Sequence, residues 1–391
     1  MKICDLTQFY SPVSGGVKRY IFEKKQYLQR LQGGDEHVLI IPGARSQKVE
    51  DMPGCQVYEI ASPLISKTSR YRALLNLNAV EEILETERPD VIESGDPYQM
   101  AWKAIASGKA LRIPTVGFYH SHFPEAYLRT ASKFLGQFGS EVMMDMASRY
   151  VSKLYSSFNR TCVPSEALRQ VLEQWGVENT VTIHLGVNTE VFCPEPEDRQ
   201  ETRKKMGLPE DAFVLLYVGR LAVEKNTRTL FQAFSQLRGQ DGMRLVIVGD
   251  GNQRGLVEAL KAEGHEVTWL PYCGDSAELA KIYRMADLFV HPGILETFGL
   301  VTLESQACGV PVVGIRGSYM DRIIYNDQQH WAAENSPEAL ARAIVAMRTQ
   351  NLRVWGKEAA EKVREKYTWE QVFSRLFTVY REVQDEYPAR Q

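Results

Sequence analysis

The chain has 391 residues, enough for two domains, because a single hydrophobic core stops growing at roughly 250 to 300 residues. It is 44% hydrophobic and 24% charged, as globular proteins are, and its formal net charge of -3 argues against nucleic acid as a partner. Its six cysteines include no C-x-x-C pair, so neither a zinc site nor a disulfide framework is indicated, and we expect a cytoplasmic protein.

The N-terminal segment "MKICDLTQFYSP" becomes polar too early for a signal peptide. No run of the sequence approaches the roughly 18 apolar residues that a membrane-spanning helix needs. We therefore expect a protein that is not integral to a membrane, and peripheral contact with the inner face of a membrane stays open.

Short β-branched segments bounded by glycine or proline alternate with amphipathic stretches along the chain. This order predicts an α/β protein with parallel sheets covered by helices, one sheet in each half. The predicted strands are residues 37–42, 89–95 and 114–120 in the first half, and 213–219, 244–251, 266–271, 287–292 and 311–315 in the second.

Three prolines and a dense run of charges interrupt this pattern at residues 184–212, which we interpret as the linker. Near the C-terminus, apolar residues recur at helical spacing and predict a long final helix; they are Val372, Phe373, Leu376, Phe377 and Tyr380. We therefore expect domains at 1–185 and 186–366, followed by a helix at 367–391.

Two cations follow the predicted strand 213–219. Arg220 comes directly after Gly219, and Lys225 lies five residues further on. Ligands of open α/β sheets collect at the carboxyl ends of the strands, so two cations here suit a phosphorylated ligand. As an isolated pair they would more often be surface charges.

The next strand ends in a Gly-Asp-Gly turn at residues 249–251. Glycines let backbone approach a ligand closely, although such turns close many strands. The third glycine of a G-x-G-x-x-G dinucleotide motif is missing.

The segment "ETFGLVTLE" places two carboxylates around a predicted helix start. Glu296 lies in the loop, a helix begins near Leu300, and Glu304 lies about one turn into it. The backbone N–H groups of Phe298, Gly299 and Leu300 form a helix N-terminus that attracts anions. This pattern of acid, positive potential and acid complements a nucleotide sugar, whereas no second Asp or His completes a metal site.

Four segments, "VGRLAVEKN", "ETFGLVTLE", "ACGVPVV" and "GVNTEVF", together resemble the retaining glycosyltransferases of family 4. The resemblance covers nearly the whole chain. It implies the GT-B fold of two facing Rossmann-like, doubly wound domains, with a C-terminal helix that crosses back to the N-terminal domain. The N-terminal domain would bind the acceptor and the C-terminal domain the nucleotide sugar.

The resemblance also implies roles for these residues. Glu296 would contact the transferred sugar, Glu304 the ribose, and Arg220 with Lys225 the diphosphate. No metal and no cofactor would be needed, since the two cations do what Mg²⁺ does elsewhere. Two alternatives stay open, in which Glu304 is an exposed helix residue and Glu296 is a loop carboxylate or helix cap.

In the first half, Gly15 and Gly16 stand where the family has a glycine pair that contacts the donor phosphate. His120 matches the family's histidine near the reacting sugar, where it would hydrogen-bond sugar or acceptor without being the general base. Taken alone, "SGG" is more often a plain turn.

Two segments bear on membrane contact. The basic segment 67–72, "KTSRYR", is either a solvated loop or an anion- or membrane-binding loop. The segment 134–157 is rich in Met, Phe and Tyr and is either an ordinary buried helix or a helix that touches the bilayer.

We thus expect a retaining, metal-independent hexosyltransferase that uses a UDP- or GDP-linked sugar and a lipid or saccharide acceptor. One alternative is a sugar-nucleotide epimerase of the same fold, which would need no acceptor. The other is a GT-B scaffold that binds without catalysis. The sugar, the nucleotide and the acceptor stay open.

Overall fold

The computed structural model describes residues 1–8, 10, 15–31, 33–65, 70–120, 139, 141–195, 197–240, 242–294, 296 and 298–387. Residues 67–69 of the basic segment 67–72 and residues 134–138 and 140 of the segment 134–157 therefore lie outside the described residues. The chain divides into two compact units, which we call the N-terminal unit (Met1–Leu185 with Trp369–Gln391) and the C-terminal unit (Gly186–Thr368).

The N-terminal unit contains an eight-stranded sheet with the order β3-β4-β2-β1-β5-β6-β7-β8. Its strands are β1 (Lys2–Leu6), β2 (Glu36–Gly43), β3 (Gln47–Met52), β4 (Cys55–Ala61), β5 (Val91–Ser94), β6 (Thr115–Phe118), β7 (Arg160–Val163) and β8 (Thr180–Thr182). All described pairs are parallel except β3 with β4. The strand order reverses between β1 and β5, which is where an open sheet forms a ligand crevice.

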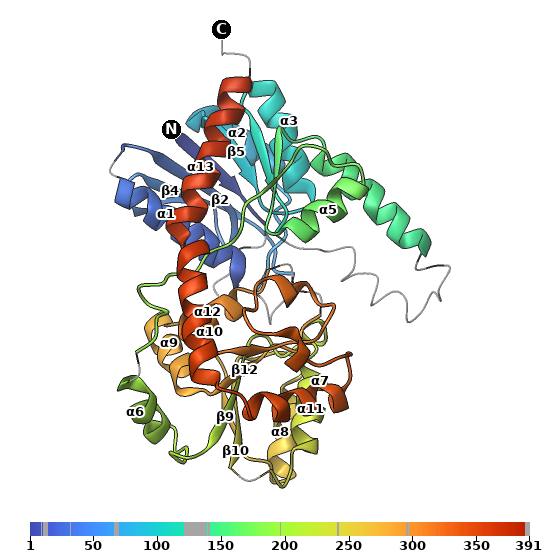
Figure 1. The fold of residues 1–391 in the computed structure, drawn as a ribbon. Helices are drawn as coiled ribbons and strands as arrows, with labels where there is room; N and C mark the ends of the chain where they lie inside the picture. Colours follow the sequence, from blue (N-terminus) through green and yellow to red (C-terminus); the bar gives the residue numbers. More distant parts are fainter. Residues whose placement is uncertain are drawn as a thin grey trace. The chain divides into compact units, whose positions relative to one another are not determined.

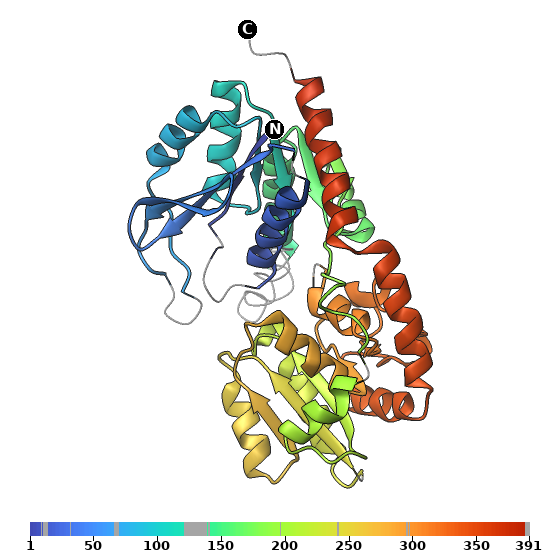
Figure 2. The same ribbon diagram turned by 90° about the vertical axis from the view of Figure 1, so that its left-hand side faces the viewer.

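The labelled helices of this unit are α1 (Gly16–Leu31), α2 (Leu77–Glu87), α3 (Gln99–Leu111), α5 (Glu166–Gln174) and α13 (Trp369–Glu386), and a further helix covers residues 141–155. The final helix α13 lies beside α1 although more than 300 residues separate them in sequence (Figure 1, Figure 2). Tyr27 of α1 packs edge-on against Phe377 and tilted against Phe373. Burial of these rings stabilises the packing of α13 against α1, because each large aromatic side chain removes much apolar surface from water.

The C-terminal unit contains a five-stranded parallel sheet with the order β11-β10-β9-β12-β13. Its strands are β9 (Phe213–Val218), β10 (Met243–Val248), β11 (Val267–Leu270), β12 (Leu288–Val290) and β13 (Val312–Val313). Each overlaps a strand predicted from sequence. The order reverses between β9 and β12, so the second ligand crevice is expected at the carboxyl ends of those two strands.

The helices of this unit are α6 (Glu197–Lys205), η1 (Val223–Lys225), α7 (Thr227–Gln236), α8 (Arg254–Ala262), α9 (Ser276–Met285), α10 (Leu300–Ala307), η2 (Tyr319–Arg322), η3 (Gln328–His330), α11 (Pro337–Arg348) and α12 (Leu352–Lys366). The helices pack in two groups. The first consists of α7, α8 and α11, and the second of α6, α9, α10 and α12. The two groups cover opposite faces of the sheet (Figure 1, Figure 2). The sheet is therefore doubly wound, as the hydrophobic strands predict.

The Gly-Asp-Gly turn after β10 packs against the neighbouring loop after β9. A Cβ atom added to Gly249, which has φ +137°, would lie 2.0 Å from the carbonyl oxygen of Gly219. Backbone hydrogen bonds join the two loops, from Gly219 N to Val248 O (2.9 Å) and from Leu221 N to Asp250 O (3.0 Å). Glycine is thus required here because two loops at strand ends approach each other closely. The sequence does not reveal that the loop after β9 is what the turn packs against.

A search of the described helices found none with the length and hydropathy needed to span a bilayer.

Candidate functional site

The first group of predicted residues gathers at the switch point of the C-terminal sheet. Strand β9 ends at Val218, directly before Gly219 and Arg220, and its neighbour β12 ends at Val290, directly before His291 and Pro292. The loop after β9 carries Lys225, and the loop after β12 carries Glu296. Parallel neighbours end at the same edge of a sheet, so both loops rise from one edge.

Lys225 contacts Glu296 directly. Its ammonium donates a short hydrogen bond to Glu296 Oε1 and forms an ion pair with it. Both side chains are partly buried, with 29% and 18% of their surface exposed. Partial burial strengthens the attraction over that of a surface pair, because less water screens it.

The charges around Glu296 keep it ionised. Burial by itself raises the pKa of this carboxyl, but Lys225, His291 and Arg220 outweigh it and hold the pKa below its usual value. His291 lies at the end of β12 and is buried, and this burial lowers its pKa, so the imidazole is neutral near pH 7. Glu296 is therefore a carboxylate that accepts hydrogen bonds across the physiological pH range.

Arg220 is differently placed from Lys225. Its guanidinium pairs with Glu224 at 3.6 Å, and 55% of its side chain is exposed. The carbonyl oxygen of Arg220 accepts a hydrogen bond from the buried hydroxyl of Tyr217 (2.9 Å), which fixes the backbone at the strand end. The side chain is thus held by one exposed ion pair of the weak kind, and a ligand can recruit it.

Helix α10 begins at Leu300, where the sequence predicts it, and Gly299 is its N-cap. Gly299 has φ +75°, and an added Cβ would lie 2.6 Å from Met320 Sδ, so both backbone and space require glycine. Among the described residues, no side chain caps this helix through a hydrogen bond. Its N-terminal end is therefore a site of positive potential at the same edge of the sheet.

Glu304 lies on the inner face of α10. It is only 9% exposed, and the Tyr283 hydroxyl donates a hydrogen bond to its Oε2 (3.0 Å). The alternative of an exposed helix residue is therefore wrong. Phe298 is buried as well and packs edge-on against Tyr367, so its predicted contribution is limited to its backbone.

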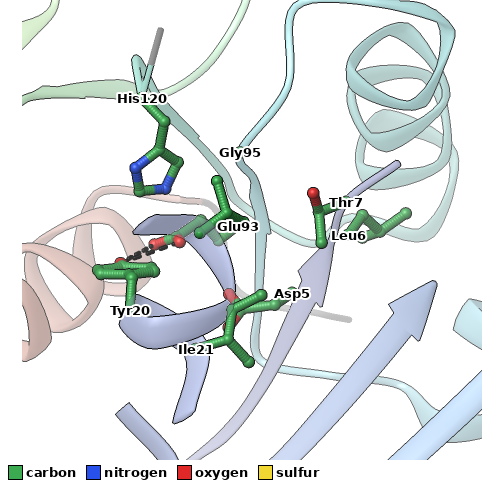
Figure 3. A pocket seen from close by; sticks show the side chains of 9 residues that line it. Asp5, Leu6, Thr7, Tyr20, Ile21, Glu93, Gly95 and His120 are labelled. Atoms are coloured by element: carbon green, nitrogen blue, oxygen red, sulfur yellow. Dashed lines mark hydrogen bonds between the residues drawn. The ribbon is translucent and has the colours of Figure 1, made fainter. Parts of the chain in front are cut away.

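A pocket lies at the switch point of the N-terminal sheet (Figure 3). Its lining residues are Asp5, Leu6, Thr7, Val17, Tyr20, Ile21, Glu93, Gly95 and His120. They come from the ends of β1 and β5, from α1 and from the residues after β6. The structure thus places His120 at the carboxyl edge of its sheet, which is the edge that the sequence indicates for ligands.

His120 is held between two aromatic rings. Its imidazole stacks on Phe118 with centroids 4.0 Å apart, and Tyr20 meets it edge-on at 4.8 Å. Burial and the nearby charge of Lys24, opposed by Asp5, together lower the pKa of His120 to about 3. The imidazole is therefore neutral at physiological pH, so one ring nitrogen can donate a hydrogen bond and the other can accept one.

Gly15 and Gly16 stand at the start of α1. Gly16 is the first helical residue, and the carbonyl oxygen of Gly15 accepts a hydrogen bond from Arg19 N (3.1 Å). Both glycines are exposed, and a Cβ added to Gly15 would meet no atom within 4 Å. The structure leaves their backbone accessible, and their role with the donor stays a prediction.

A buried network of charged and polar groups underlies the pocket, and sequence analysis missed it. The fully buried Lys24 ammonium donates to Asp5 Oδ1 (2.8 Å), Glu93 Oε1 (3.0 Å) and the Tyr380 hydroxyl (3.0 Å). The hydroxyls of Tyr20 (3.0 Å) and Tyr380 in turn donate to Glu93. Burial raises the pKa of Glu93, whereas Lys24 holds that of Asp5 low against its own burial.

The sequence contained part of the signal for this network. A lysine inside the apolar stripe of α1 and an acid in the middle of the hydrophobic strand β5 are polar residues at core positions. Their pairing depends on the sheet order and on the return of α13, neither of which a local pattern reveals.

Among the described residues, no group of three or more His, Cys, Asp or Glu side chains lies close enough to hold a metal ion. The expectation that catalysis needs no metal stays a prediction.

Comparison with known proteins identifies the family. Residues 14–191 match the model described as "Glycosyltransferase Family 4", and residues 198–365 match "Glycosyl transferases group 1". The chain is 31% identical over 375 residues to the GDP-mannose-dependent alpha-(1-6)-phosphatidylinositol dimannoside mannosyltransferase of Mycobacterium tuberculosis, covering 95% of this chain and 93% of the relative. The chain belongs to glycosyltransferase family 4.

Other relatives of this glycosyltransferase have names that state a lipid substrate or product. The alpha-monoglucosyldiacylglycerol synthase of Acholeplasma laidlawii is 25% identical over 91% of this chain and 90% of its own. Neither an epimerase nor a non-catalytic scaffold is favoured by these similarities.

Solved structures share the fold. Sucrose-phosphate synthase from Thermosynechococcus elongatus superposes with a TM-score of 0.79 at 21% identity, over 98% of this chain and 99% of that one. Anabaena HepE, solved with UDP and glucose, gives a TM-score of 0.74 at 17% identity over 98% and 100%. The two Rossmann-like units therefore form a GT-B glycosyltransferase, as the resemblance implies.

Proposed function

We propose that this glycosyltransferase transfers a hexosyl group from a nucleotide-diphosphate sugar to a hydroxyl of a lipid-linked acceptor, with retention of configuration and without a metal ion. The observation that carries the proposal is the contact of Lys225 with Glu296 at the switch point of the C-terminal sheet. GDP-mannose is the donor we expect, because three relatives are named as GDP-mannose-dependent mannosyltransferases. A UDP-linked hexose is the alternative, since HepE was solved with UDP and glucose.

In this proposal the diphosphate binds to the positive groups of the site. Lys225 supplies a point charge, Arg220 leaves its exposed partner Glu224 to provide a planar pair of donors, and the N-terminus of α10 at Gly299 and Leu300 adds backbone N–H groups. These charges stabilise the diphosphate most when it departs, which lowers the barrier rather than only binding the substrate.

The carboxylates bind hydroxyl groups. Glu296 accepts hydrogen bonds from the transferred sugar and positions it, which suits a group that stays ionised beside Lys225. Glu304, oriented by Tyr283, accepts from the ribose. Neither acts as a nucleophile, in contrast to the paired carboxylates of retaining glycosidases.

The transfer itself is a substitution on one face of the sugar. The bond between the anomeric carbon and the phosphate oxygen breaks, and the bond from that carbon to the acceptor oxygen forms on the same face. The acceptor's proton passes to the departing phosphate oxygen, so no protein base is required. The neutral imidazole of His120 hydrogen-bonds sugar or acceptor.

The test is transfer from GDP-mannose, with UDP-glucose in parallel, to a mixture of glycosylated and diacylglycerol lipids. We expect an α-linked product by NMR of the anomeric proton, matching the donor, because both bond changes occur on one face. Turnover should stay within about twofold when EDTA is added, because Arg220 and Lys225 neutralise the diphosphate.

An inverted product would overturn the one-face mechanism, and loss of activity in EDTA that Mg²⁺ restores would overturn metal independence. Consumption of the donor without an acceptor, yielding an epimeric nucleotide sugar, would favour the epimerase instead.

We further propose that a loop of the N-terminal unit contacts the membrane that carries the acceptor. The apolar side chains of this loop are unusually exposed; they are Leu64 (46%), Ile65 (62%) and Leu75 (64%). No acidic residue occurs between Glu59 and Glu81, whereas Arg70 and Arg72 do. Val142 and Met146, one turn apart on the helix 141–155, are also exposed. Apolar side chains among cations suit an anionic lipid surface.

Replacing both Ile65 and Leu75 by serine should lower binding to vesicles with anionic lipid by about 30-fold or more, since each apolar side chain contributes roughly 1 kcal/mol or more on insertion. Sedimentation with sucrose-loaded vesicles measures this. Tyr272→Ser removes an equally exposed ring from the C-terminal unit and should leave binding unchanged. Equal binding by all three proteins would contradict the contact.

A further inference from the structure

Among the described residues, two polar contacts join the loop after β9 to the loop after β12. One is the Lys225–Glu296 ion pair. The other is a hydrogen bond from the side-chain amide of Asn226, the residue next to Lys225, to the carbonyl oxygen of Pro292 (2.8 Å). Pro292 is buried and lies four residues before Glu296, so this second contact is also close to the carboxylate.

Both polar atoms of the Asn226 amide form hydrogen bonds. Its Nδ2 donates to Pro292 O and to Asn335 Oδ1 (2.7 Å), and its Oδ1 accepts from the Thr229 hydroxyl (2.9 Å). The orientation of the amide follows from chemistry, because a carbonyl such as Pro292 O can only accept. Three hydrogen bonds therefore hold one side chain that carries no charge.

The backbone at this position admits few residues. Asn226 has φ +56° and ψ +29°, the left-handed conformation that glycine and asparagine adopt most readily. It ends η1 directly after Lys225 and directly precedes α7 at Thr227. Glycine would satisfy this backbone equally well, but only asparagine also supplies the bridge to Pro292.

The two contacts respond differently to a ligand. A bound diphosphate competes with Glu296 for the Lys225 ammonium, and sugar hydroxyls compete with Lys225 for the carboxylate, so the ion pair weakens when the site fills. The amide bond of Asn226 involves neither charged group. It persists when the ion pair is replaced, and it then joins the two loops through the reaction.

We propose that Asn226 is a positioning residue that holds Lys225 in register with Glu296 while both bind the donor. This inference rests on the donor-binding roles given to Lys225 and Glu296 under the proposed function. A displacement of about 1 Å in either group can cost on the order of 100-fold in rate, so the hydrogen bond to Pro292 matters beyond its own strength.

The test is Asn226→Gly, which keeps the left-handed backbone and removes the side-chain amide, and with it the bridge to Pro292 and the hydrogen bonds with Asn335 and Thr229. We expect kcat/KM for the donor to fall by about 10-fold to 100-fold, with most of the loss in kcat and little change in the melting temperature. Asn226→Asp also fits the backbone but faces the Pro292 carbonyl with a second acceptor, so it should be at least as impaired. Thr229→Val is the matched control, because it removes the hydrogen bond to the amide oxygen and leaves the bridge to Pro292 in place.

A double-mutant cycle separates positioning from general loosening of the fold. If Asn226 acts through Lys225, Asn226→Gly should cost less than about threefold in the Lys225→Ala background. The same loss in both backgrounds, or a wild-type rate for Asn226→Gly, would overturn the inference. A wild-type rate for Lys225→Ala would instead remove the proposed role of Lys225 itself, so the two failures are distinguishable.

Discussion

Replacement of Lys225 by alanine should lower kcat by about 100-fold to 1,000-fold while the protein stays folded, because the variant loses the charge that stabilises the departing diphosphate. The structure gives this lysine a second role, since it lowers the pKa of Glu296. Without it, Glu296 should protonate at a higher pH, and the acidic limb of the activity profile should move upward. Steady-state kinetics at saturating donor, repeated between pH 4 and 8, would measure both effects.

Two other variants test whether the loss of kcat is specific to the cations of the site. Arg220→Ala should also lower kcat, because the proposal gives the guanidinium the same diphosphate. Lys281→Ala removes a partly exposed lysine that pairs with the exposed Glu278 (2.6 Å) on α9 and should leave kinetics unchanged. Kinetics like those of the wild type in both Lys225→Ala and Arg220→Ala would remove the cationic role on which the proposed reaction depends.

The second large effect concerns stability. Lys24→Met should destabilise the N-terminal unit by about 3 to 5 kcal/mol, because it leaves the buried Asp5 and Glu93 without their shared cation. Methionine fills nearly the same space, so the loss reflects the charge rather than a cavity. The hydroxyl of Tyr380 loses its donor as well, which loosens the attachment of α13. Differential scanning calorimetry should show a lower melting temperature for this unit.

An exposed pair in the same unit is the control. Arg149 pairs with Asp145 at 2.9 Å with both side chains more than half exposed, so Arg149→Met should cost less than about 1 kcal/mol. A melting profile of Lys24→Met that matches that of Arg149→Met would mean that the buried network contributes nothing. An activity assay would not tell a stabilising role of the network from a catalytic one. Loss of stability in the residues beneath the pocket would also displace His120.

Local pattern predicted the five strands of the C-terminal sheet but only three of the eight in the N-terminal sheet, since β1, β3, β4, β7 and β8 are not among the predicted ranges. The segments around β2, β5 and β6, and all five strands of the C-terminal sheet, are apolar runs bounded by glycine or proline, and this signal depends only on neighbours in sequence. The antiparallel strand β3 was not predicted, because most of its residues are exposed, half are charged, and it lies at the edge of the sheet. An edge strand that is exposed in this way has no hydrophobic run that would predict it.

The site residues were found to different extents. Arg220, Lys225, Glu296 and Glu304 could be placed from the motifs that surround them, and the start of α10 at Leu300 from its glycine and spacing. His291 and Asn226 were missed. A histidine after a buried strand and an asparagine after a lysine carry no signal by themselves, because the contacts that distinguish them are made to residues elsewhere in the chain.

The sequence by itself determined that two α/β domains form, where their strands end, and which charges follow those ends, since each of these properties depends on the period and the boundaries of short segments. Tertiary structure alone decided which groups meet. Lys225 and Glu296 are 71 residues apart, Asn226 and Pro292 are 66 apart, and Lys24 and Tyr380 are 356 apart. Such pairs arise only because the strand order brings β9 beside β12, and because α13 buries its aromatic face against α1. No local pattern encodes a partner at that distance.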